Sequence, residues 1–275
     1  MEGYEIVILA IFCTVLALIL LWLFLVAPRA RKKAVSPFLR PYAHRGLWND
    51  TVPENSLIAF RRAAERGFAI ELDVQLSKDG EVMVFHDYTL TRMCGTDEKL
   101  ADLTAKELGA RHLAGTEEHI PTLKEVLAVV GGRVPLLIEL KGESGNTALC
   151  PILSAVLADY DGQWCVESFN PLLLRWWKKH RPDVVRGLLS TDLIKEKRAG
   201  SKALNFALSA LLLTFLCRPA FHAYDYHHPR RLALWVGIHL LGAAPVVYTT
   251  RDEATYRQYL SRGIPPIFDG FEPRS

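Results

Sequence analysis

Four short motifs in the first half of the chain combine histidines, carboxylates and cationic side chains. The first is His44-Arg45-Gly46 together with the Pro53-Glu54-Asn55-Ser56 stretch that follows it. The other three are Glu71-Leu72-Asp73-Val74, His86-Asp87 and Glu139-Leu140-Lys141. Residues two apart in a strand share a face, so Glu71 and Asp73 would point the same way, as would Glu139 and Lys141. Side chains at the C-terminal ends of different strands converge in a parallel barrel.

Three of these carboxylates, Glu71, Asp73 and Glu139, would then lie together. Like charges repel each other unless a cation neutralises them, and an all-oxygen ligand set suits Mg²⁺ or Ca²⁺. Two histidines beside such a site, His44 and His86, could supply an acid and a base near neutral pH. The motifs together predict a metal-assisted reaction.

The cationic residues indicate that the site binds a phosphate group. Each motif also has a structural explanation. Arg45 can bind a phosphate as a planar fork, and Lys141 can offset charge that develops in a transition state. A single histidine at a strand end is often structural, a Glu-x-Asp pair often neutralises a neighbouring lysine, and Asp87 could cap a turn. The order and spacing of all the motifs favour the catalytic interpretation.

Short apolar runs that alternate with amphipathic segments must position these motifs. A chain of 275 residues has the length of one (β/α)₈ barrel, and strand–helix alternation predicts parallel strands with crossover helices. Nine runs compete for the eight places of a barrel, so one is extra, and the sequence does not show which. The strand candidates are Tyr42–His44, Ala69–Leu76, Val82–His86, Pro135–Lys141, Trp164–Ser168, Gly187–Leu189, Phe221–Tyr224, Val246–Thr249 and Ile267–Phe268.

Four amphipathic segments have the period of helices. Asn55 or Ser56 is a suitable N-cap for the first of them. The helix candidates are Ser56–Arg66, Ala105–Leu113, Leu123–Val130 and Glu253–Arg262.

The motifs HRG, PEN, ELDV, VMVFHD and IELK, in this order, resemble the glycerophosphodiester phosphodiesterase family. The resemblance extends from about Tyr42 to the C-terminus, and it is dense up to Lys141 and thin beyond. The stretches DYTLTRMCGT, DLTAKEL, IPTLKEVL and VESFNP are also similar to the family. The resemblance implies a (β/α)₈ barrel that hydrolyses glycerophosphodiesters to glycerol 3-phosphate and an alcohol with a divalent cation.

The resemblance also implies roles for single residues. His44 and His86 are similar to the family's acid–base pair, and Glu71, Asp73 and Glu139 match its metal ligands. In the implied mechanism one histidine takes a proton from the glycerol hydroxyl and the other protonates the leaving alkoxide. Water then opens a cyclic phosphate, and the order in which the histidines act stays open.

The substrate-binding residues follow from the same resemblance, with two departures. Arg45 matches a phosphate-contacting arginine, Glu54 an acid near the metal and glycerol, and Lys141 the fourth-strand lysine. Many members carry Trp-Thr-Val-Asn where this chain has Val247-Tyr248-Thr249-Thr250, and we expect Tyr248 to line the glycerol pocket. The family's closing Thr-Asp is also altered, to Phe268-Asp269 within the final strand segment.

The N-terminus predicts a membrane anchor over residues 1–28. Ile6–Ala27 is apolar apart from Thr14, which is enough to cross a bilayer core. The preceding MEGYE has two acids and no base, unlike a signal peptide, although a cleaved signal or a buried helix stays possible. Residues 29–40 form a basic linker that, by the positive-inside rule, places the catalytic domain in the cytoplasm of a single-pass cell-membrane protein. Its basic residues are Arg29, Arg31, Lys32, Lys33 and Arg40.

The barrel domain, residues 41–275, contains an apolar insertion at about 191–219. Within it, Ala203–Cys217 would form a helix with a narrow polar stripe of Asn205 and Ser209. We expect its broad apolar face to dock the barrel mouth on the bilayer, with a core-facing helix or a dimer contact as the alternatives. The basic residues that precede it are Lys195, Lys197, Arg198 and Lys202.

Composition excludes several other classes. The net charge of +3 and the lack of a basic stripe argue against nucleic acid as a partner. Five cysteines without CxxC spacing argue against a zinc site or a disulfide scaffold. The remaining partners are the bilayer and a glycerophosphodiester or lysophospholipid substrate. The alternatives are a phospholipase D-like enzyme that cleaves lysophospholipids, or a non-catalytic membrane-tethered binding protein. The leaving alcohol, the preferred cation and the oligomeric state stay open.

Overall fold

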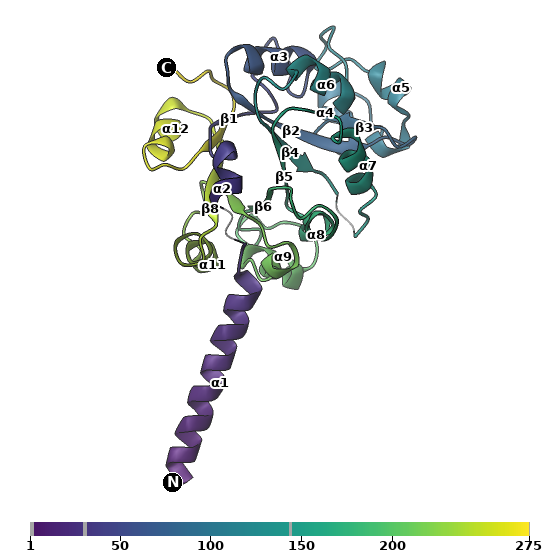
Figure 1. Ribbon diagram of the computed structural model, residues 1–275. Helices are drawn as coiled ribbons and strands as arrows, with labels where there is room; N and C mark the ends of the chain where they lie inside the picture. The colour runs from purple at the N-terminus through teal and green to yellow at the C-terminus, as the bar shows by residue number, and fades with distance from the viewer. Residues whose placement is uncertain (1–2, 30–31, 143–144, 275) are drawn as a thin grey trace.

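The computed structural model describes residues 3–29, 32–142 and 145–274. Arg31 of the predicted basic flank, residues 1–2 of the predicted anchor and Ser275 therefore lie outside the described residues. The chain forms a barrel with one long helix that leaves it (Figure 1).

Eight parallel strands close the barrel, as the sequence predicts. Strand β1 pairs with β2 on one side and with β9 on the other, which closes the sheet. The barrel strands are β1 (Tyr42–His44), β2 (Ala69–Leu76), β4 (Leu136–Leu140), β5 (Trp164–Ser168), β6 (Arg186–Ser190), β7 (Phe221–Asp225), β8 (Ala244–Thr250) and β9 (Pro266–Phe268).

The extra candidate is β3 (Val82–Val84), which pairs with β2 in the antiparallel direction. Only five residues separate the two strands, and the Ser77 amide donates a hydrogen bond to the Glu81 carbonyl across this turn. A parallel neighbour would need a crossover of a dozen residues or more. The length of the turn thus decides which of the nine runs leaves the barrel.

Helices cover the outside of the barrel (Figure 1). Ser56 caps the first helix after β1, because its hydroxyl accepts a hydrogen bond from the Ala59 amide. The covering helices are α3 (Leu57–Glu65), α6 (Leu123–Val130), α7 (Leu149–Val156), α8 (Pro171–His180), α9 (Lys202–Ser209), α10 (Thr214–Cys217), α11 (Leu232–Trp235) with η3 (Val236–Leu240), and α12 (Glu253–Leu260). The segment between β3 and β4 adds α4 (Thr91–Cys94), η2 (Leu100–Asp102) and α5 (Ala105–Gly109). Helix α5 ends at Gly109, four residues before the predicted end, in keeping with the low helix propensity of glycine.

The predicted linker packs against the barrel and is not a free connection. Its residues form α2 (Lys32–Val35) and η1 (Ser36–Phe38), and Val35 and Phe38 are buried with residues from the starts of the barrel strands. The Tyr42 hydroxyl donates a hydrogen bond of 2.8 Å to the Phe38 carbonyl. The linker therefore closes the N-terminal end of the barrel, opposite the end where the strand-end motifs lie.

Helix α1 (Gly3–Val26) has 24 residues and is apolar throughout most of its length. Its segment Tyr4–Val26 has a mean hydropathy of 3.1 and is exposed over most of its length, with Val26 buried at its end. A helix of this length and composition near the N-terminus can be a membrane anchor or a signal sequence. Its C-terminal end contacts α10, where the Phe24 and Phe215 rings lie 5.8 Å apart.

The predicted continuous 15-residue apolar helix is wrong. It divides into α9 and α10, because the chain turns at Leu211, which has a φ of +56°. The polar stripe of α9 faces the protein: Asn205 and Ser209 are buried, whereas Leu204 and Phe206 are exposed. The core-facing alternative for this apolar face therefore does not hold for α9.

Candidate active site

The three predicted metal ligands meet at the C-terminal ends of β2 and β4. The two strands pair in register with Asp73 opposite Glu139, and Glu71 lies two residues before Asp73 on the same face. One oxygen from each carboxylate lies within 4.8 Å of the others, and all three side chains are buried. The alternation of side chains along the strands therefore brings the three together as the sequence predicts.

Burial makes the charged forms of these carboxylates unfavourable. Desolvation, with the neighbouring Asp73 and Glu139 charges, raises the pKa of Glu71 well above its usual range. Desolvation also raises the pKa of Glu139. Burial alone would raise the pKa of Asp73 too, but the Lys141 and Arg45 charges hold it below its usual range. The Lys141 Nζ lies 2.7 Å from Glu139 Oε1 and 2.9 Å from Asp73 Oδ1.

A fourth buried carboxylate, Glu167, adds to this negative charge. It lies on β5 directly opposite Glu139, and burial raises its pKa well above the usual range. If all four carboxylates were ionised, their charges would exceed those of Lys141 and Arg45 by two, and the raised pKa values of Glu71, Glu139 and Glu167 reflect the cost of that excess. A divalent cation would balance this excess, and its preference for oxygen ligands fits the donor set. The sequence analysis did not single out Glu167, although VESFNP contains it.

Histidine His44 ends β1 and contacts two carboxylates. Its Nδ1 lies 2.9 Å from Asp269 Oδ2, and its Nε2 lies 3.9 Å from Glu71 Oε2. Burial and the Arg45 charge lower the pKa of His44, so the neutral ring is favoured at pH 7. Asp269 directly follows β9 and also binds Arg251, whose Nε lies 3.2 Å from Asp269 Oδ1.

Histidine His86 has a similar arrangement on the chain after β3. Its Nδ1 lies 2.6 Å from Asp87 Oδ1, and Arg92 Nε donates a hydrogen bond of 2.7 Å to Asp87 Oδ2. Burial lowers the pKa of His86 as well. The amide of Gln75 donates hydrogen bonds to the carbonyls of Phe85 and Asp87, which fixes the strand end. Both histidines therefore bind a carboxylate through Nδ1, which leaves Nε2 for a substrate.

Arg45 and Glu54 form a locked pair beside the carboxylates. Arg45 Nη1 lies 2.7 Å from Glu54 Oε1, and Arg45 Nε lies 3.3 Å from Asp73 Oδ2. The Arg45 amide donates to Glu71 Oε2 at 3.0 Å, with the residue at a φ of +59°. Arg92 Nη2 donates a second hydrogen bond of 2.6 Å to Glu54 Oε1.

Gly46 allows the chain to turn after this pair. Its φ is +84°, and a Cβ atom there would lie 2.9 Å from the backbone of Ala59. A residue with a side chain would therefore displace α3. The sequence motif His44-Arg45-Gly46 thus combines two chemical groups with the turn that positions them.

Tyr248 lies on the β8 side of the same barrel mouth. Its hydroxyl donates a hydrogen bond of 3.0 Å to the Ser190 carbonyl at the end of β6. Its ring packs edge-on against Phe169, with 6.0 Å between the ring centroids. The two rings therefore lie together on this side of the mouth, and Phe169 was not predicted as part of the site.

Three further residues support the site, and sequence reasoning did not assign them a role in it. Asn55 Nδ2 donates a hydrogen bond of 2.9 Å to Asp73 Oδ2. Asp269 contacts His44 directly, and Arg92 binds Asp87, the partner of His86. Asp269 lies 225 positions from His44, so no local pattern connects the two. The one available signal was its place directly after the last strand.

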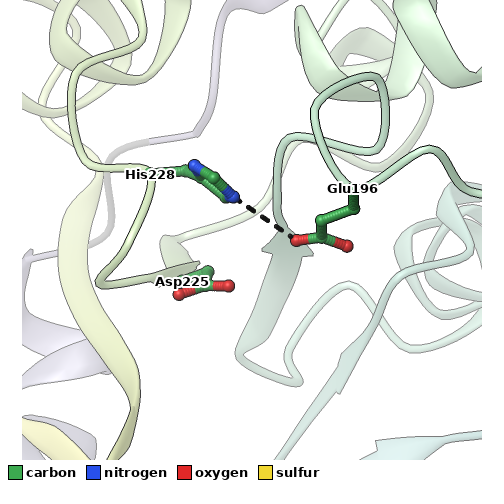
Figure 2. Close-up of side chains that lie close together, drawn as sticks. All are labelled: Glu196, Asp225 and His228. Carbon is green, nitrogen blue, oxygen red and sulfur yellow. Dashed lines mark ion pairs between the residues drawn. The ribbon is translucent and has the colours of Figure 1, made fainter.

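A second cluster of possible metal ligands lies at the edge of the mouth and was not predicted (Figure 2). It contains Glu196, Asp225 and His228, whose ligand atoms lie within 4.8 Å of one another. His228 Nε2 lies 3.7 Å from Glu196 Oε1, and Asp225 Oδ1 lies 2.8 Å from His227 Nδ1. The Thr191 hydroxyl donates to the Glu196 carboxylate, so this cluster is held by its own neighbours. Glu196 is exposed, and the other two residues are half-buried.

The fold and the strand-end site define a (β/α)₈ barrel with a buried carboxylate cluster. Residues 44–269 match the model of the glycerophosphoryl diester phosphodiesterase family, and the chain belongs to this family. The match contains every residue of the candidate site described above.

Individual relatives agree with the family assignment. The chain is 36% identical to a glycerophosphodiester phosphodiesterase of Caldanaerobacter subterraneus, over 54% of this chain and 65% of that protein. It is 40% identical to one of Bacillus altitudinis, over 56% of this chain and 68% of that protein. The chain thus matches about two thirds of the length of these relatives.

A solved structure has the same barrel. An Oleispira antarctica phosphodiesterase in complex with its product sn-glycerol-3-phosphate aligns with a TM-score of 0.70 and 26% identity. The alignment covers 86% of this chain and 94% of that protein. The likeness extends over nearly all of the barrel domain.

Proposed function

We propose that this protein hydrolyses glycerophosphodiesters to glycerol 3-phosphate and an alcohol, with a divalent cation held by Glu71, Asp73 and Glu139. The single observation that carries the proposal is the buried cluster of these three carboxylates, whose ligand oxygens lie within 4.8 Å of one another. Membership of the family and the product complex of the Oleispira relative support the same chemistry. Mg²⁺ and Ca²⁺ both fit an all-oxygen site.

The binding residues have separate tasks in this mechanism. A bound divalent cation would polarise the phosphate and lower the pKa of the adjacent glycerol hydroxyl. Arg45, held in place by Glu54, binds a phosphate oxygen through its guanidinium group. Lys141 offsets the negative charge that grows on the phosphate in the transition state. Tyr248 and Phe169 enclose the glycerol carbons and exclude water from that side.

The two histidines move the protons. In the first step one neutral histidine accepts the proton of the glycerol hydroxyl through Nε2, while the hydroxyl oxygen bonds to phosphorus. The bond from phosphorus to the leaving alcohol breaks, and the other histidine, in its protonated form, donates a proton to that alcohol. In the second step water opens the cyclic phosphate with the proton transfers reversed, which yields glycerol 3-phosphate. Asp269 and Asp87 stabilise whichever ring is protonated.

We also propose that α1 remains as a single-pass anchor in the cell membrane. Arg218 supports this, because its Nη1 donates hydrogen bonds to the carbonyls of Phe24 and Ala27 at the end of α1. The Arg29 amide adds a hydrogen bond to the Pro219 carbonyl. Cleavage of α1 as a signal sequence would remove the carbonyls to which Arg218 donates these hydrogen bonds. The basic residues after α1 favour a cytoplasmic barrel by the positive-inside rule, with substrates derived from membrane lipids.

A phospholipase D-like reaction on lysophospholipids is the second candidate function. The exposed apolar side chains of Leu204 and Phe206, on the helix that follows β6, favour it because they offer a surface for an acyl chain. The same metal and histidine chemistry would serve both reactions. The non-catalytic alternative is disfavoured, because both histidines and all three predicted ligands are present together.

Product analysis with purified protein in detergent tests these proposals. Glycerophosphocholine and lysophosphatidylglycerol would be supplied with Mg²⁺, Ca²⁺ or EDTA, beside the His44→Ala variant. Release of glycerol 3-phosphate that needs both metal and His44 is the expected result. Release of lysophosphatidic acid from the lysolipid alone would favour the second candidate, and no turnover of any diester would overturn both.

A further inference from the structure

Exposed apolar side chains gather on two helices that follow neighbouring strands. They are 46–71% exposed, although a soluble surface usually spreads such residues singly. They lie on α9, on α11 with η3, and in the loop before α9: Ile194, Leu204, Phe206, Leu232, Trp235 and Leu240. We call these six residues the apolar surface.

Helix α9 has its faces in the opposite orientation to an ordinary barrel helix. Asn205 Nδ2 donates a hydrogen bond of 2.9 Å to the Arg198 carbonyl, and Ser209 Oγ accepts one of 3.0 Å from the Leu193 amide. These bonds hold the polar side of the helix against the protein. A surface helix normally buries its apolar side, so the outward Leu204 and Phe206 require an apolar environment outside the barrel.

Arg231 joins α9 to α11. Its guanidinium donates hydrogen bonds of 3.2 Å to the carbonyls of Ser209 and Thr191, and one of 2.8 Å to Ser190 Oγ. Arg231 is also the N-cap residue of α11. Arg231 therefore connects the end of α9 to the start of α11, and the two helices follow the C-terminal ends of the neighbouring strands β6 and β7.

The position of α1 indicates what covers this surface. Helix α1 leaves the barrel beside α10, the helix that follows α9. Figure 1 shows α9 and α11 on the side of the molecule from which α1 leaves. Exposed basic residues lie within a few positions of members of the apolar surface in the sequence, and their charge complements an anionic lipid surface. They are Lys195, Lys197, Arg198, Lys202 and Arg230.

We propose that the apolar surface lies in the interface of the anionic bilayer that α1 enters. The inference rests on the proposed anchor and deepens it: the β6–β7 edge of the barrel mouth is held at the lipid headgroups. A glycerophosphodiester that is part of a lipid can then reach the site from the bilayer. The sequence attributed docking to residues 203–217, whereas the structure assigns it to α9, α11 and η3, because α10 packs against α1 and α8.

Hydroxyl-radical footprinting of the full-length protein tests this placement. The protein would be reconstituted as a single copy per nanodisc that contains phosphatidylglycerol and phosphatidylcholine. The control is Tyr88, which is 43% exposed, close to the 50% of Trp235 and the 59% of Phe206, but follows β3 in another part of the barrel. After correction for intrinsic reactivity, we expect Trp235 and Phe206 to be oxidised about tenfold more slowly than Tyr88, because the interface excludes water.

Equal corrected rates at the three side chains would overturn the proposal. Protection that requires two copies per nanodisc would do the same, because the partner would then be a second chain. The double variant Phe206→Glu with Trp235→Glu, beside the control Leu260→Glu on α12, adds an activity readout. We expect the double variant to be about tenfold less active than the wild type on lysophosphatidylglycerol in vesicles. Its activity on soluble glycerophosphocholine should be unchanged.

These readouts separate the two proposals. If the wild-type protein hydrolyses no diester, the proposed function fails, while the footprint still reports where the surface lies. If hydrolysis occurs but the footprint shows no protection, the surface proposal fails alone.

Discussion

Two clusters at the barrel mouth offer similar metal-ligand chemistry in different surroundings. Glu71, Asp73 and Glu139 come from adjacent strands and are buried. In the second cluster Asp225 ends β7 and Glu196 and His228 come from loops, and all three are exposed or half-buried. Water can solvate the charges of the second cluster, but the first cluster has lost that solvation. Burial of like charges is costly unless a partner compensates it, so we expect the buried cluster, rather than the exposed one, to hold the proposed cation.

The partners of the two clusters lead to the same distinction. The exposed cluster is held by Thr191 and His227, which lie within five residues of its members. The buried cluster is contacted by Lys141, two residues after Glu139, and by Arg45, which follows β1, and its carboxylates still outnumber these two cations. Proximity of ligand atoms is therefore a weak criterion for a metal site. The burial of carboxylates without enough cationic partners is the more informative one.

The largest expected effect separates the clusters by activity. We expect Glu139→Gln to lower kcat for glycerophosphocholine by about a thousandfold or more, because it removes a ligand of the catalytic cation. The matched variant Glu196→Gln should change kcat by less than about twofold, because an exposed carboxylate contributes little. Glycerol 3-phosphate release at saturating Mg²⁺ measures both. A comparable loss in both variants would remove the distinction between the clusters.

The second prediction concerns the carboxylate that orients His44. We expect Asp269→Asn to lower kcat by about ten- to a hundredfold with little change in KM, because His44 loses the partner that fixes its ring. The Asp183→Asn variant, at an exposed Asp–Arg pair on the surface, serves as the control. Steady-state kinetics at constant pH give kcat and KM separately. A change in KM alone would assign Asp269 to substrate binding.

The third prediction concerns stability without metal. The raised pKa of Glu71 means that its charged form is unfavourable in the fold, so folding stability falls as pH rises from about 4.5 towards the folded pKa. In EDTA at pH 7 we expect Glu71→Gln to raise Tm by a few degrees, roughly 1–2 kcal/mol. Addition of Mg²⁺ should stabilise the wild type and not the variant. An unchanged or lower Tm in EDTA would show that the cluster is already compensated.

The smallest effect tests burial of a titratable group away from any cluster. Burial lowers the pKa of His222 on β7 to about 3, and in the described part of the chain neither ring nitrogen has a hydrogen-bond partner. Unfolding exposes a ring of ordinary pKa, so stability falls with a slope up to about 1.4 kcal/mol per pH unit as pH drops below 6.5. In His222→Leu this part of the slope should disappear. Thermal unfolding between pH 5 and pH 7 measures it, and equal slopes would contradict the prediction.

Local patterns predicted much of the fold and the centre of the site. Alternation along β2 and β4 placed Glu71, Asp73 and Glu139 on one face, and the N-cap at Ser56 and the helix Leu123–Val130 followed from their own residues. These features depend on neighbours within a few positions of the chain. Periodicity and motif order therefore sufficed for them.

Features that depend on distant partners were not predictable in this way. Asp269 reaches His44 only because the barrel closes, and Arg92 reaches Glu54 across 38 positions. Closure and packing decide these contacts, and a single sequence contains no direct record of either.

Direct measurement of metal binding tests the central claim. The full-length protein in detergent would be stripped with EDTA and titrated with Mn²⁺, with the bound ion followed by electron paramagnetic resonance. We predict one tightly bound ion per chain, lost in Asp73→Asn and in Glu139→Gln and retained in Glu196→Gln. Retention of the ion in both buried-cluster variants, or its loss in Glu196→Gln, would contradict the assignment of the catalytic cation to the buried cluster.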